Sequence, residues 1–366
     1  MKAPILTALA AALPSTMPFV GPETQERALG RPFRARLGAN ESLFGPSPRA
    51  VAAMQAAAGQ VWQYGDPENH DLKAALAAHH ACDPAPIVVA EGIDALLGYL
   101  VRLMISPGDP VVTSLGAYPT FNFHVTGHGG ILHRAPYLGA HEDPDALLTL
   151  AAKTRARLLY LANPDNPMGS HHPAATILRL IAALPPETLL VLDEAYIDLA
   201  PPGTAPMIDP DTAGVIRLRT FSKAHGLAGL RVGYAITSAP LAQAFDRVRN
   251  HFAVGRIAQA GALAALQDQG WLAHIRQSAD HARATLTRIA LDNGLTPLPS
   301  ATNFLTMDLG RDGAYARAVL AALIHDGIFV RMPGVAPLDR CIRVSFGNDA
   351  ALDLFAQALP RALQAV

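Results

Sequence analysis

The sequence predicts a three-layer α/β/α domain with a mostly parallel sheet, followed by a smaller α+β unit. Three observations carry this prediction. Short apolar runs without polar alternation recur between residues 87 and 236, which indicates strands buried on both faces. Stretches with helical periodicity separate most of these runs, as the crossovers of a parallel sheet require. After residue 241 long helical stretches dominate, with few strands between them.

The elements of the sheet domain are expected to alternate along the chain. A helix over 48–58 comes first. Strands are expected at 87–90, 110–114, 131–135, 157–162, 189–192, 215–218 and 232–236, with helices at 93–105, 119–125, 143–153 and 174–184. In such a sheet, ligands bind outside the carboxyl ends of the strands, so polar residues that follow strands should gather at one edge.

The second unit is expected to be built mainly from helices. Helices are predicted at 241–250, 257–269, 271–293 and 315–326, and strands at 303–308, 328–331 and 341–345. Residues 14–40 are weakly periodic and read as an arm or loop. The predicted organisation is 1–47 as N-terminal arm and part of the small domain, 48–250 as the large domain, and 251–366 as the small C-terminal domain.

Composition limits the classes of partner. The chain of 366 residues has room for two domains, and its 29 basic and 30 acidic residues give no support for a nucleic-acid or membrane partner. Cys82 and Cys341 cannot form a disulfide framework, so a reducing compartment, the cytoplasm, is expected. The apolar start at 5–13 reads as an amphipathic helix, with a targeting signal as the open alternative. No apolar run approaches membrane-spanning length.

The stretch 215–234 carries the most unusual chemistry. Two apolar runs enclose a polar turn with Ser222 and Lys223, several small residues and Arg231. A lone lysine usually lies on the surface. A partly desolvated lysine, however, has a lowered pKa and can add to a carbonyl as the neutral amine. Ser222 and Arg231 would then hold a phosphate group.

This segment, Ser222-Lys-Ala-His-Gly-Leu-Ala-Gly-Leu-Arg231, resembles the lysine motif of the class I/II aminotransferases, which depend on pyridoxal phosphate and have fold type I. Within them it is most similar to the histidinol-phosphate aminotransferase subfamily. Asn163-Pro-Asp-Asn-Pro-Met-Gly169 resembles a second family motif, and the likeness covers roughly residues 37–347. It implies pyridoxal 5'-phosphate as cofactor and Lys223 as the catalytic residue.

The resemblance also implies which residues hold the cofactor phosphate. Gly92, Ile93 and Asp94 stand where the family has a turn at a helix start, a position that binds phosphate through backbone N–H groups. Ile93 replaces a small residue there, so one hydroxyl contact is missing. Tyr64, in Gln-Tyr-Gly-Asp-Pro, matches the tyrosine that reaches the cofactor phosphate of a neighbouring subunit. A homodimer is therefore expected, with a packing tyrosine as the alternative.

Four residues are implied at the cofactor ring. Tyr118 would stack on the pyridine ring, while Asn166 and Tyr196 would contact its phenolic oxygen. Asp193 would keep the ring nitrogen protonated, which makes the ring an electron sink. Alone, three of them have a plain alternative: a turn residue for Tyr118 and Asn166, or a helix cap for Asp193.

Substrate binding is implied for Arg343, Arg331 and Asn40. The planar guanidinium suits two-pronged contacts to carboxylate or phosphate, although either arginine alone could be an ordinary strand-edge charge. Two departures from the subfamily stand out. Met17-Pro-Phe19 lacks the hydroxyl of a tyrosine that helps to hold the substrate phosphate, and His225 stands where an aromatic residue such as Phe is usual.

The expected reaction is ping-pong transamination between L-histidinol phosphate, or an aromatic amino acid, and 2-oxoglutarate. A lyase like threonine-phosphate decarboxylase and a regulator that binds the cofactor without catalysis stay open as alternatives. Such regulators carry a helix-turn-helix domain, for which this chain has no room. His124, His128 and His133 lack a completing acid, so no metal is expected.

Overall fold

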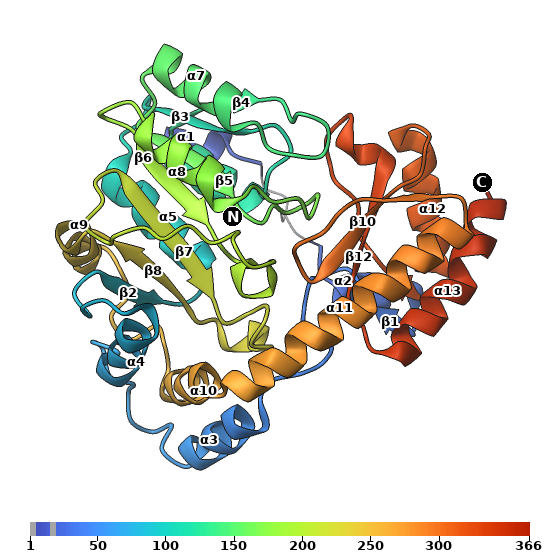
Figure 1. Ribbon diagram of the computed structural model, residues 1–366, viewed down its shortest axis with the longest axis horizontal. Coiled ribbons are helices and arrows are strands. Elements are labelled where there is room, and N and C mark those ends of the chain that lie inside the picture. The colour runs from blue at the N-terminus through green and yellow to red at the C-terminus, as the bar shows by residue number, and fades with distance from the viewer. Residues whose placement is uncertain (1–4, 15–19) are drawn as a thin grey trace.

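The computed structural model describes residues 5–14 and 20–366. It shows a large layered unit and a smaller unit, with the long helix α11 (Gln269–Asp292) running from one to the other (Figure 1). The smaller unit holds the C-terminus, and the first described residues lie at the large unit. The chain begins to leave the large unit at α11, so this helix fixes the two units to each other.

The large unit is built on a seven-stranded sheet whose order is β2-β8-β7-β6-β5-β3-β4. Its strands are β2 (Ile87–Ala90), β3 (Pro110–Ser114), β4 (Ile131–Ala135), β5 (Leu158–Ala162), β6 (Leu189–Asp193), β7 (Val215–Thr220) and β8 (Gly233–Thr237). All pairings from β4 to β7 are parallel, and only β8 runs antiparallel to its neighbours. The prediction of a mostly parallel sheet in an α/β fold is confirmed.

Helices cover both faces of this sheet, because its strands bury apolar side chains on both sides. One core contains residues of α5 (Ile93–Met104), α6 (Pro119–Gly127) and α9 (Ala239–Ala244). A second core contains residues of α7 (Pro144–Thr154) and α8 (Ala174–Ala182). The expected helix at 241–250 is shorter, since α9 gives way to a 3-10 turn at Phe245–Arg247.

The smaller unit has two short sheets and its own core. An antiparallel sheet has the order β12-β10-β9, formed by Cys341–Ser345, Phe304–Asp308 and Thr296–Pro297. A parallel pair joins β1 (Ala35–Arg36) to β11 (Ile328–Phe329). Their apolar side chains pack with α11, α12 (Gly313–His325) and α13 (Asp349–Gln364). The start of the chain thus completes a core that is otherwise C-terminal.

The expectation of an arm or loop over residues 14–40 is wrong in one part. Helix α2 (Pro22–Leu29) begins with a proline at its first turn and ends at Gly30, whose φ of 67° lies in the left-handed region. This placement of proline and glycine is the usual one for a helix start and stop. Arg36 forms ion pairs with Glu23 and Glu26 that hold α2 against β1.

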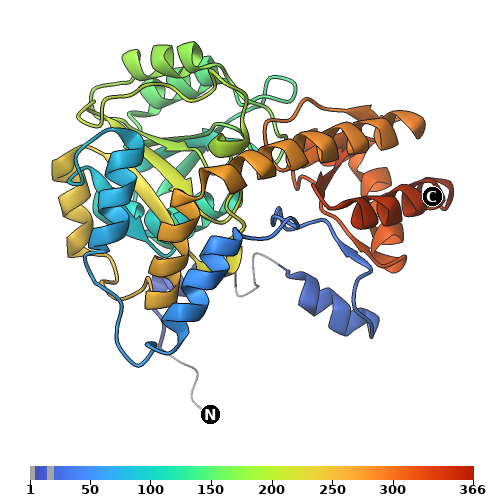
Figure 2. The ribbon, with the colours of Figure 1, turned by 60° about the horizontal axis from the view of Figure 1, so that its bottom comes forward.

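The predicted domain boundary at residue 251 stays a prediction, but packing favours a later one. Helix α10 (Arg256–Gln267) lies beside α3 (Pro48–Ala58), as Figure 2 shows, and it also contacts α4 (His70–His80). Its buried alanines share a core with Val89 and Tyr234 of the large sheet. A division after α10 accounts for this packing. Within the described residues, no helix is long and apolar enough to cross a membrane.

Candidate active site

A cavity of 490 Å³ lies at the carboxyl ends of β5, β6 and β7, where the two units meet. The structure brings most of the predicted site residues together around it. Its lining includes Asn40, Ile93, Asp94, Tyr118, Asn166, Asp193, Tyr196, Ser222, Lys223, Arg231, Arg331 and Arg343. Gly92 lies directly beside this lining, in contact with Arg231, whereas Tyr64 lies outside the cavity of its own chain.

Lys223 lies in the loop that follows β7. Its Nζ donates to the backbone carbonyl of Asn40 at 3.2 Å and lies 5.7 Å from the centre of the Tyr196 ring. Burial, together with the charge of Arg343, lowers the pKa of Lys223 to about 8. A fraction of this amine is therefore neutral near physiological pH, as a nucleophilic lysine requires.

Asp193 is the last residue of β6, and its carboxylate is buried. Oδ2 accepts a hydrogen bond from the Tyr160 hydroxyl at 2.7 Å, and Oδ1 accepts one from the Ala195 N–H at 3.0 Å. Burial raises the pKa of Asp193 to about 6. Among the described residues, no basic side chain forms an ion pair with it, so a cationic N–H donor in the cavity would stabilise its ionised form.

One end of the cavity is built to hold an anion. Helix α5 begins after Gly92, which has a φ of 92°, and no side chain caps this helix start. Arg231 donates to Ser222 Oγ at 3.4 Å and to Asp94 Oδ2 at 3.3 Å. A helix start, a guanidinium and a hydroxyl together are the groups that a phosphate cradle needs. A Cβ on Gly92 would lie 2.6 Å from Arg231 Nη2, so glycine is required for this approach.

Asn40 and two tyrosines shape the middle of the cavity. Asn40 Nδ2 donates to the Tyr196 hydroxyl at 2.9 Å, and its Oδ1 accepts from Ser345 Oγ at 3.1 Å. The Tyr118 hydroxyl donates to Asp94 at 3.3 Å, and burial raises the pKa of Tyr118 to about 12. Tyr118 is thus a neutral aromatic wall. Asn40, predicted to bind substrate, lines the cavity and also holds Tyr196 in place.

Two arginines of the smaller unit face the cavity. Arg343 donates to Asn166 Oδ1 and to the Gly38 carbonyl, and Arg331 donates to the Val20 carbonyl at 2.8 Å. Neither guanidinium forms an ion pair with a carboxylate of the described residues, and the Nε of each is buried without a partner. Buried charges are costly unless they are paired. This arrangement is therefore suited to bind oxyanions of a ligand.

Comparison with known proteins agrees with this geometry. Residues 35–359 match the family model described as aminotransferase class I and II. The chain belongs to this aminotransferase family. The predicted resemblance is thereby confirmed, and so are the family's fold and its pyridoxal-phosphate-dependent chemistry.

The relatives of this aminotransferase include many proteins named for one activity. It is 35% identical over 347 residues to the histidinol-phosphate aminotransferase of Rhodospirillum centenum, which covers 93% of this chain and 94% of the relative. A crystal structure of the histidinol-phosphate aminotransferase from Sinorhizobium meliloti, in complex with pyridoxal-5'-phosphate, is 54% identical. The two structures superpose with a TM-score of 0.96, and the match covers 98% of both chains. An aspartate aminotransferase of Thermus thermophilus, 22% identical with a TM-score of 0.76, shares the fold.

Two buried carboxyl groups outside the cavity lining of this aminotransferase were not predicted from the sequence. Glu142 accepts from the Ala162 N–H, and Asp165, within the Asn163–Gly169 segment, accepts from the Tyr137 hydroxyl. Burial raises the pKa of both carboxyl groups. Asp165 could have been found, because it lies within the Asn163–Gly169 motif. Nothing in the sequence around Glu142 indicates that its carboxyl group is buried. Phe19 lies outside the described residues. The described residues contain no group of three or more metal-ligating side chains.

Proposed function

We propose that this chain is a pyridoxal-phosphate-dependent aminotransferase that transfers an amino group from L-histidinol phosphate to 2-oxoglutarate, a step of histidine biosynthesis. The observation that carries the proposal is the position of Lys223, a partly neutral amine between a phosphate cradle and the buried Asp193 carboxylate. The names of the most similar relatives support the choice of substrate.

The residues present fit the cofactor at each of its polar ends. Ser222, Arg231 and the start of α5 would hold the phosphate. Asp193, which lacks a cationic partner among the described residues, would accept the N–H of a protonated ring nitrogen. Tyr118 would cover the ring, and Tyr196 and Asn166 would contact its phenolic oxygen. When bound, pyridoxal phosphate supplies an electron sink that stabilises negative charge at the substrate α-carbon.

The reaction then depends on what the side chains of this chain do. Lys223 would anchor the cofactor, and its amine would move a proton to and from the substrate α-carbon as a general base and acid. Asp193 would keep the ring nitrogen protonated. Arg343 and Arg331 hold the substrate's oxyanions, so that the α-carbon lies close to the amine of Lys223. The same pair would take histidinol phosphate and 2-oxoglutarate in turn, because both carry oxyanions.

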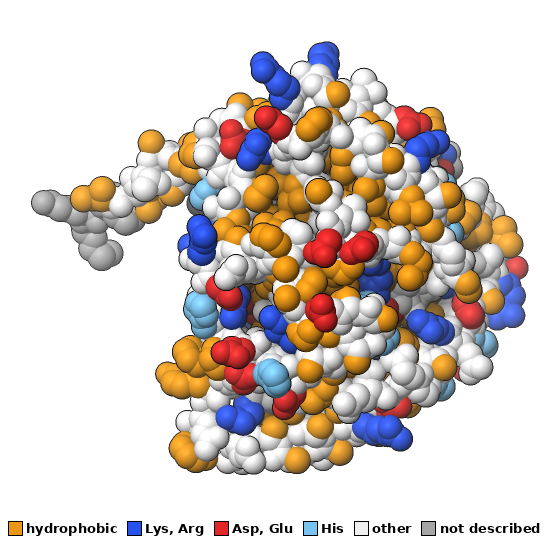
Figure 3. Space-filling view, turned by 60° about the vertical axis from the view of Figure 1, so that its left-hand side comes forward, with side chains coloured by type: hydrophobic (Ala, Val, Ile, Leu, Met, Phe, Trp, Pro, Cys, Tyr) orange, Lys and Arg blue, Asp and Glu red, His pale blue; other side chains and the backbone are white. Residues whose placement is uncertain are grey.

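We also propose that the working protein is a homodimer in which Tyr64 reaches the neighbouring cavity. Tyr64 is 77% exposed, and its ring lies 4.9 Å from that of Phe252, which is also exposed. Trp62 and Val61 beside it are exposed as well. Hydrophobic side chains gather across the middle of the face in Figure 3, and the described N-terminal residues extend outward at the upper left edge of that view. Such patches mark association surfaces.

The N-terminal segment supports the same proposal. Helix α1 (Ala8–Ala12) has only five residues and buries none of them in its own chain. An isolated helix this short is not stable in water, so a second subunit that covers it would supply the missing contacts. The cytoplasm is the location we propose, because both cysteines, Cys82 and Cys341, are free thiols.

The test is a single-turnover assay with the purified holoenzyme. The visible absorbance of the bound cofactor is followed after mixing with L-histidinol phosphate, glutamate or aromatic amino acids. We expect histidinol phosphate and glutamate each to cause a rapid loss of this absorbance. The Lys223→Ala substitution should slow that loss by about 10³-fold or more. If only glutamate or aromatic amino acids cause the loss of absorbance, histidinol phosphate is not the substrate and the amino donor is an amino acid. Release of carbon dioxide without a keto acid would indicate a lyase, and no reaction with any compound would indicate a regulator.

A further inference from the structure

The loop that carries Lys223 rests on a buried cluster of charged side chains. Glu194, which follows Asp193, accepts from Arg217 at 3.0 and 3.1 Å and from Arg219 at 2.8 Å. Arg219 Nη1 also lies 3.7 Å from Asp198 Oδ1. These four side chains are at most 19% exposed. Within these four side chains two carboxylates and two guanidiniums balance, and the guanidinium of Arg276 lies beside them, with its Nε on the Asp198 carbonyl.

His225 joins the lysine loop to this cluster. Its Nε2 lies 3.9 Å from Asp198 Oδ2, which is close enough for attraction but too long for a hydrogen bond. The Gly226 N–H donates to the Lys223 carbonyl at 3.1 Å, so His225 lies within the same turn as the lysine. The imidazole does not line the cavity, and its ring packs on Phe221 at 5.0 Å.

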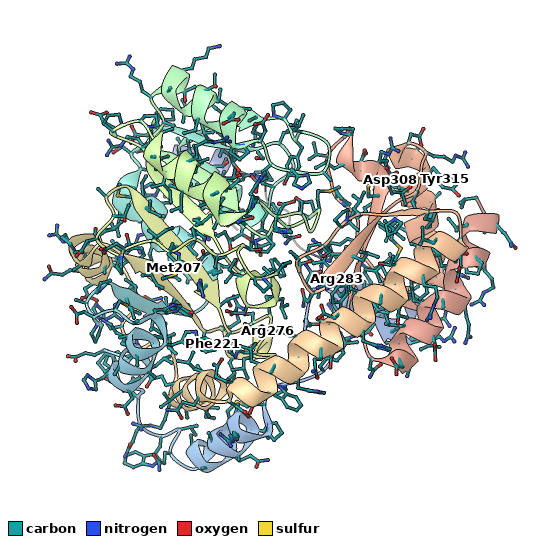
Figure 4. All side chains as sticks on the ribbon, viewed as in Figure 1. Met207, Phe221, Arg276, Arg283, Asp308 and Tyr315 are labelled. Carbon is teal, nitrogen blue, oxygen red and sulfur yellow. The ribbon has the colours of Figure 1, made fainter. Side chains whose placement is uncertain are left out.

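The groups around His225 come from several elements. Asp198 lies in the 3-10 turn Ile197–Leu199, His79 lies on α4, and Arg276 lies on α11, where its Nε donates to the Asp198 carbonyl at 2.7 Å. Figure 4 shows Phe221 and Arg276 in the same region, where α11 meets the large unit. Tyr234 of β8, near Arg219, binds His80 at 3.0 Å. Burial lowers the pKa of His225, and Asp198 opposes that effect.

We propose that His225 is a positioning residue for Lys223, and that protonation of its imidazole moves the lysine turn toward Asp198 and weakens cofactor binding. The proposal rests on the function proposed above. A protonated imidazole would add one positive charge to a balanced, buried cluster. The Asp198 carboxylate lies 3.9 Å from Nε2, and closing this gap to hydrogen-bond distance would displace the turn that contains Lys223.

The experiment compares cofactor affinity across pH in wild type and His225→Phe. Phenylalanine packs on Phe221 as the imidazole does but cannot titrate. At pH 8 the two dissociation constants for pyridoxal phosphate, measured by absorbance titration of the apoprotein, should agree within about twofold. Because burial lowers the pKa of His225, the comparison extends to pH 4.5, and between pH 8 and pH 4.5 the wild type should lose at least about threefold more affinity than the variant. The ratio of the two constants isolates His225, because Asp193 and the cofactor phosphate titrate in both proteins.

Two further variants make the result unambiguous. Asp198→Asn removes the carboxylate that attracts the imidazolium and should cancel the excess loss as His225→Phe does, which answers the question if His225→Phe does not fold. His171→Phe is the matched control, because burial lowers the pKa of His171 as well, and its charged neighbour is His141 instead of a member of the cluster. The proposal is overturned if the ratio of the wild-type and His225→Phe dissociation constants stays constant with pH. It is also overturned if the control variant changes this pH dependence as much as His225→Phe does. Absence of cofactor binding at pH 8 in the wild type would instead refute the proposed function.

Discussion

Asp193 is a residue at which stability and function oppose each other. Burial raises its pKa from 3.8 to about 6, so the folded apoprotein holds this proton more tightly than the unfolded chain does. The free energy of unfolding therefore decreases as the pH rises from about 4 to about 6, and the full penalty is present above that range. A cationic ring nitrogen would remove the penalty, which explains why the site tolerates an unpaired buried acid.

Asp193→Asn should stabilise the apoprotein at pH 7.5 by about 1–3 kcal/mol, because the amide carries no charge to bury. Urea unfolding of both apoproteins at pH 7.5 and at pH 4.5 measures this, and the difference in free energy of unfolding should fall to about a third at the lower pH. The same variant should lose at least about tenfold in cofactor affinity. A variant that is less stable than wild type at pH 7.5 would contradict the argument.

Arg343 should not tolerate replacement by lysine, although the charge is kept. Its guanidinium contacts Asn166 and the Gly38 carbonyl while its Nε stays free for a ligand, and a lysine amine cannot reproduce this fork. We expect Arg343→Lys to lower kcat/KM for both substrates by about tenfold or more, with cofactor absorbance unchanged. Arg340→Lys is the control, because Arg340 pairs with Asp308 at the surface. This substitution should lower kcat/KM by less than about twofold.

At the scale of elements, cofactor affinity should be as sensitive to a substitution at the start of α5 as to the loss of a cavity side chain. Gly92→Ala places a Cβ 2.6 Å from Arg231 Nη2 at a φ of 92°, so the arginine or the helix start has to shift. We expect about tenfold or greater loss of pyridoxal phosphate affinity, measured by absorbance titration. Gly108→Ala carries the same backbone strain, with a φ of 94°, in open space. It should cost about 1–2 kcal/mol of stability and leave cofactor affinity unchanged.

The elements show what sequence can and cannot predict. The strands of the large sheet were placed within two residues, because apolar runs of four to six residues have few other interpretations. Helices α4 and α13 were not predicted, because neither is adjacent to a motif that marks its position. Most cavity residues could be named because they belong to family motifs at or near strand ends, although Arg343 lies within β12 and Arg231 precedes β8. The cluster beneath Lys223 could not, because the pairing of Glu194 with Arg217 and Arg219 depends on how neighbouring strands align.

At the scale of the whole molecule, the proposed cross-subunit site makes a quantitative prediction. Lys223→Ala and Tyr64→Ala are each expected to be impaired as homodimers. A mixed dimer contains one site with both native residues. After subunit exchange of equal amounts, about half of the dimers are mixed and half of their sites are intact, so about a quarter of wild-type activity should return. Light scattering should show two chains per particle. No recovery with proven exchange would mean that Tyr64 acts within its own chain or only packs.

The pairing of β1 with β11 sets an order of events during synthesis. Ala35 pairs with Ile328, so the smaller unit cannot close until nearly the whole chain has left the ribosome. The large sheet, complete at Thr237, can form long before that. Nascent chains stopped near residue 300 should therefore resist protease over the sheet and remain cleavable before residue 48. The cavity is finished last, because its lining includes Arg331 and Arg343, so substrate capture by a growing chain would report that β12 has left the ribosome.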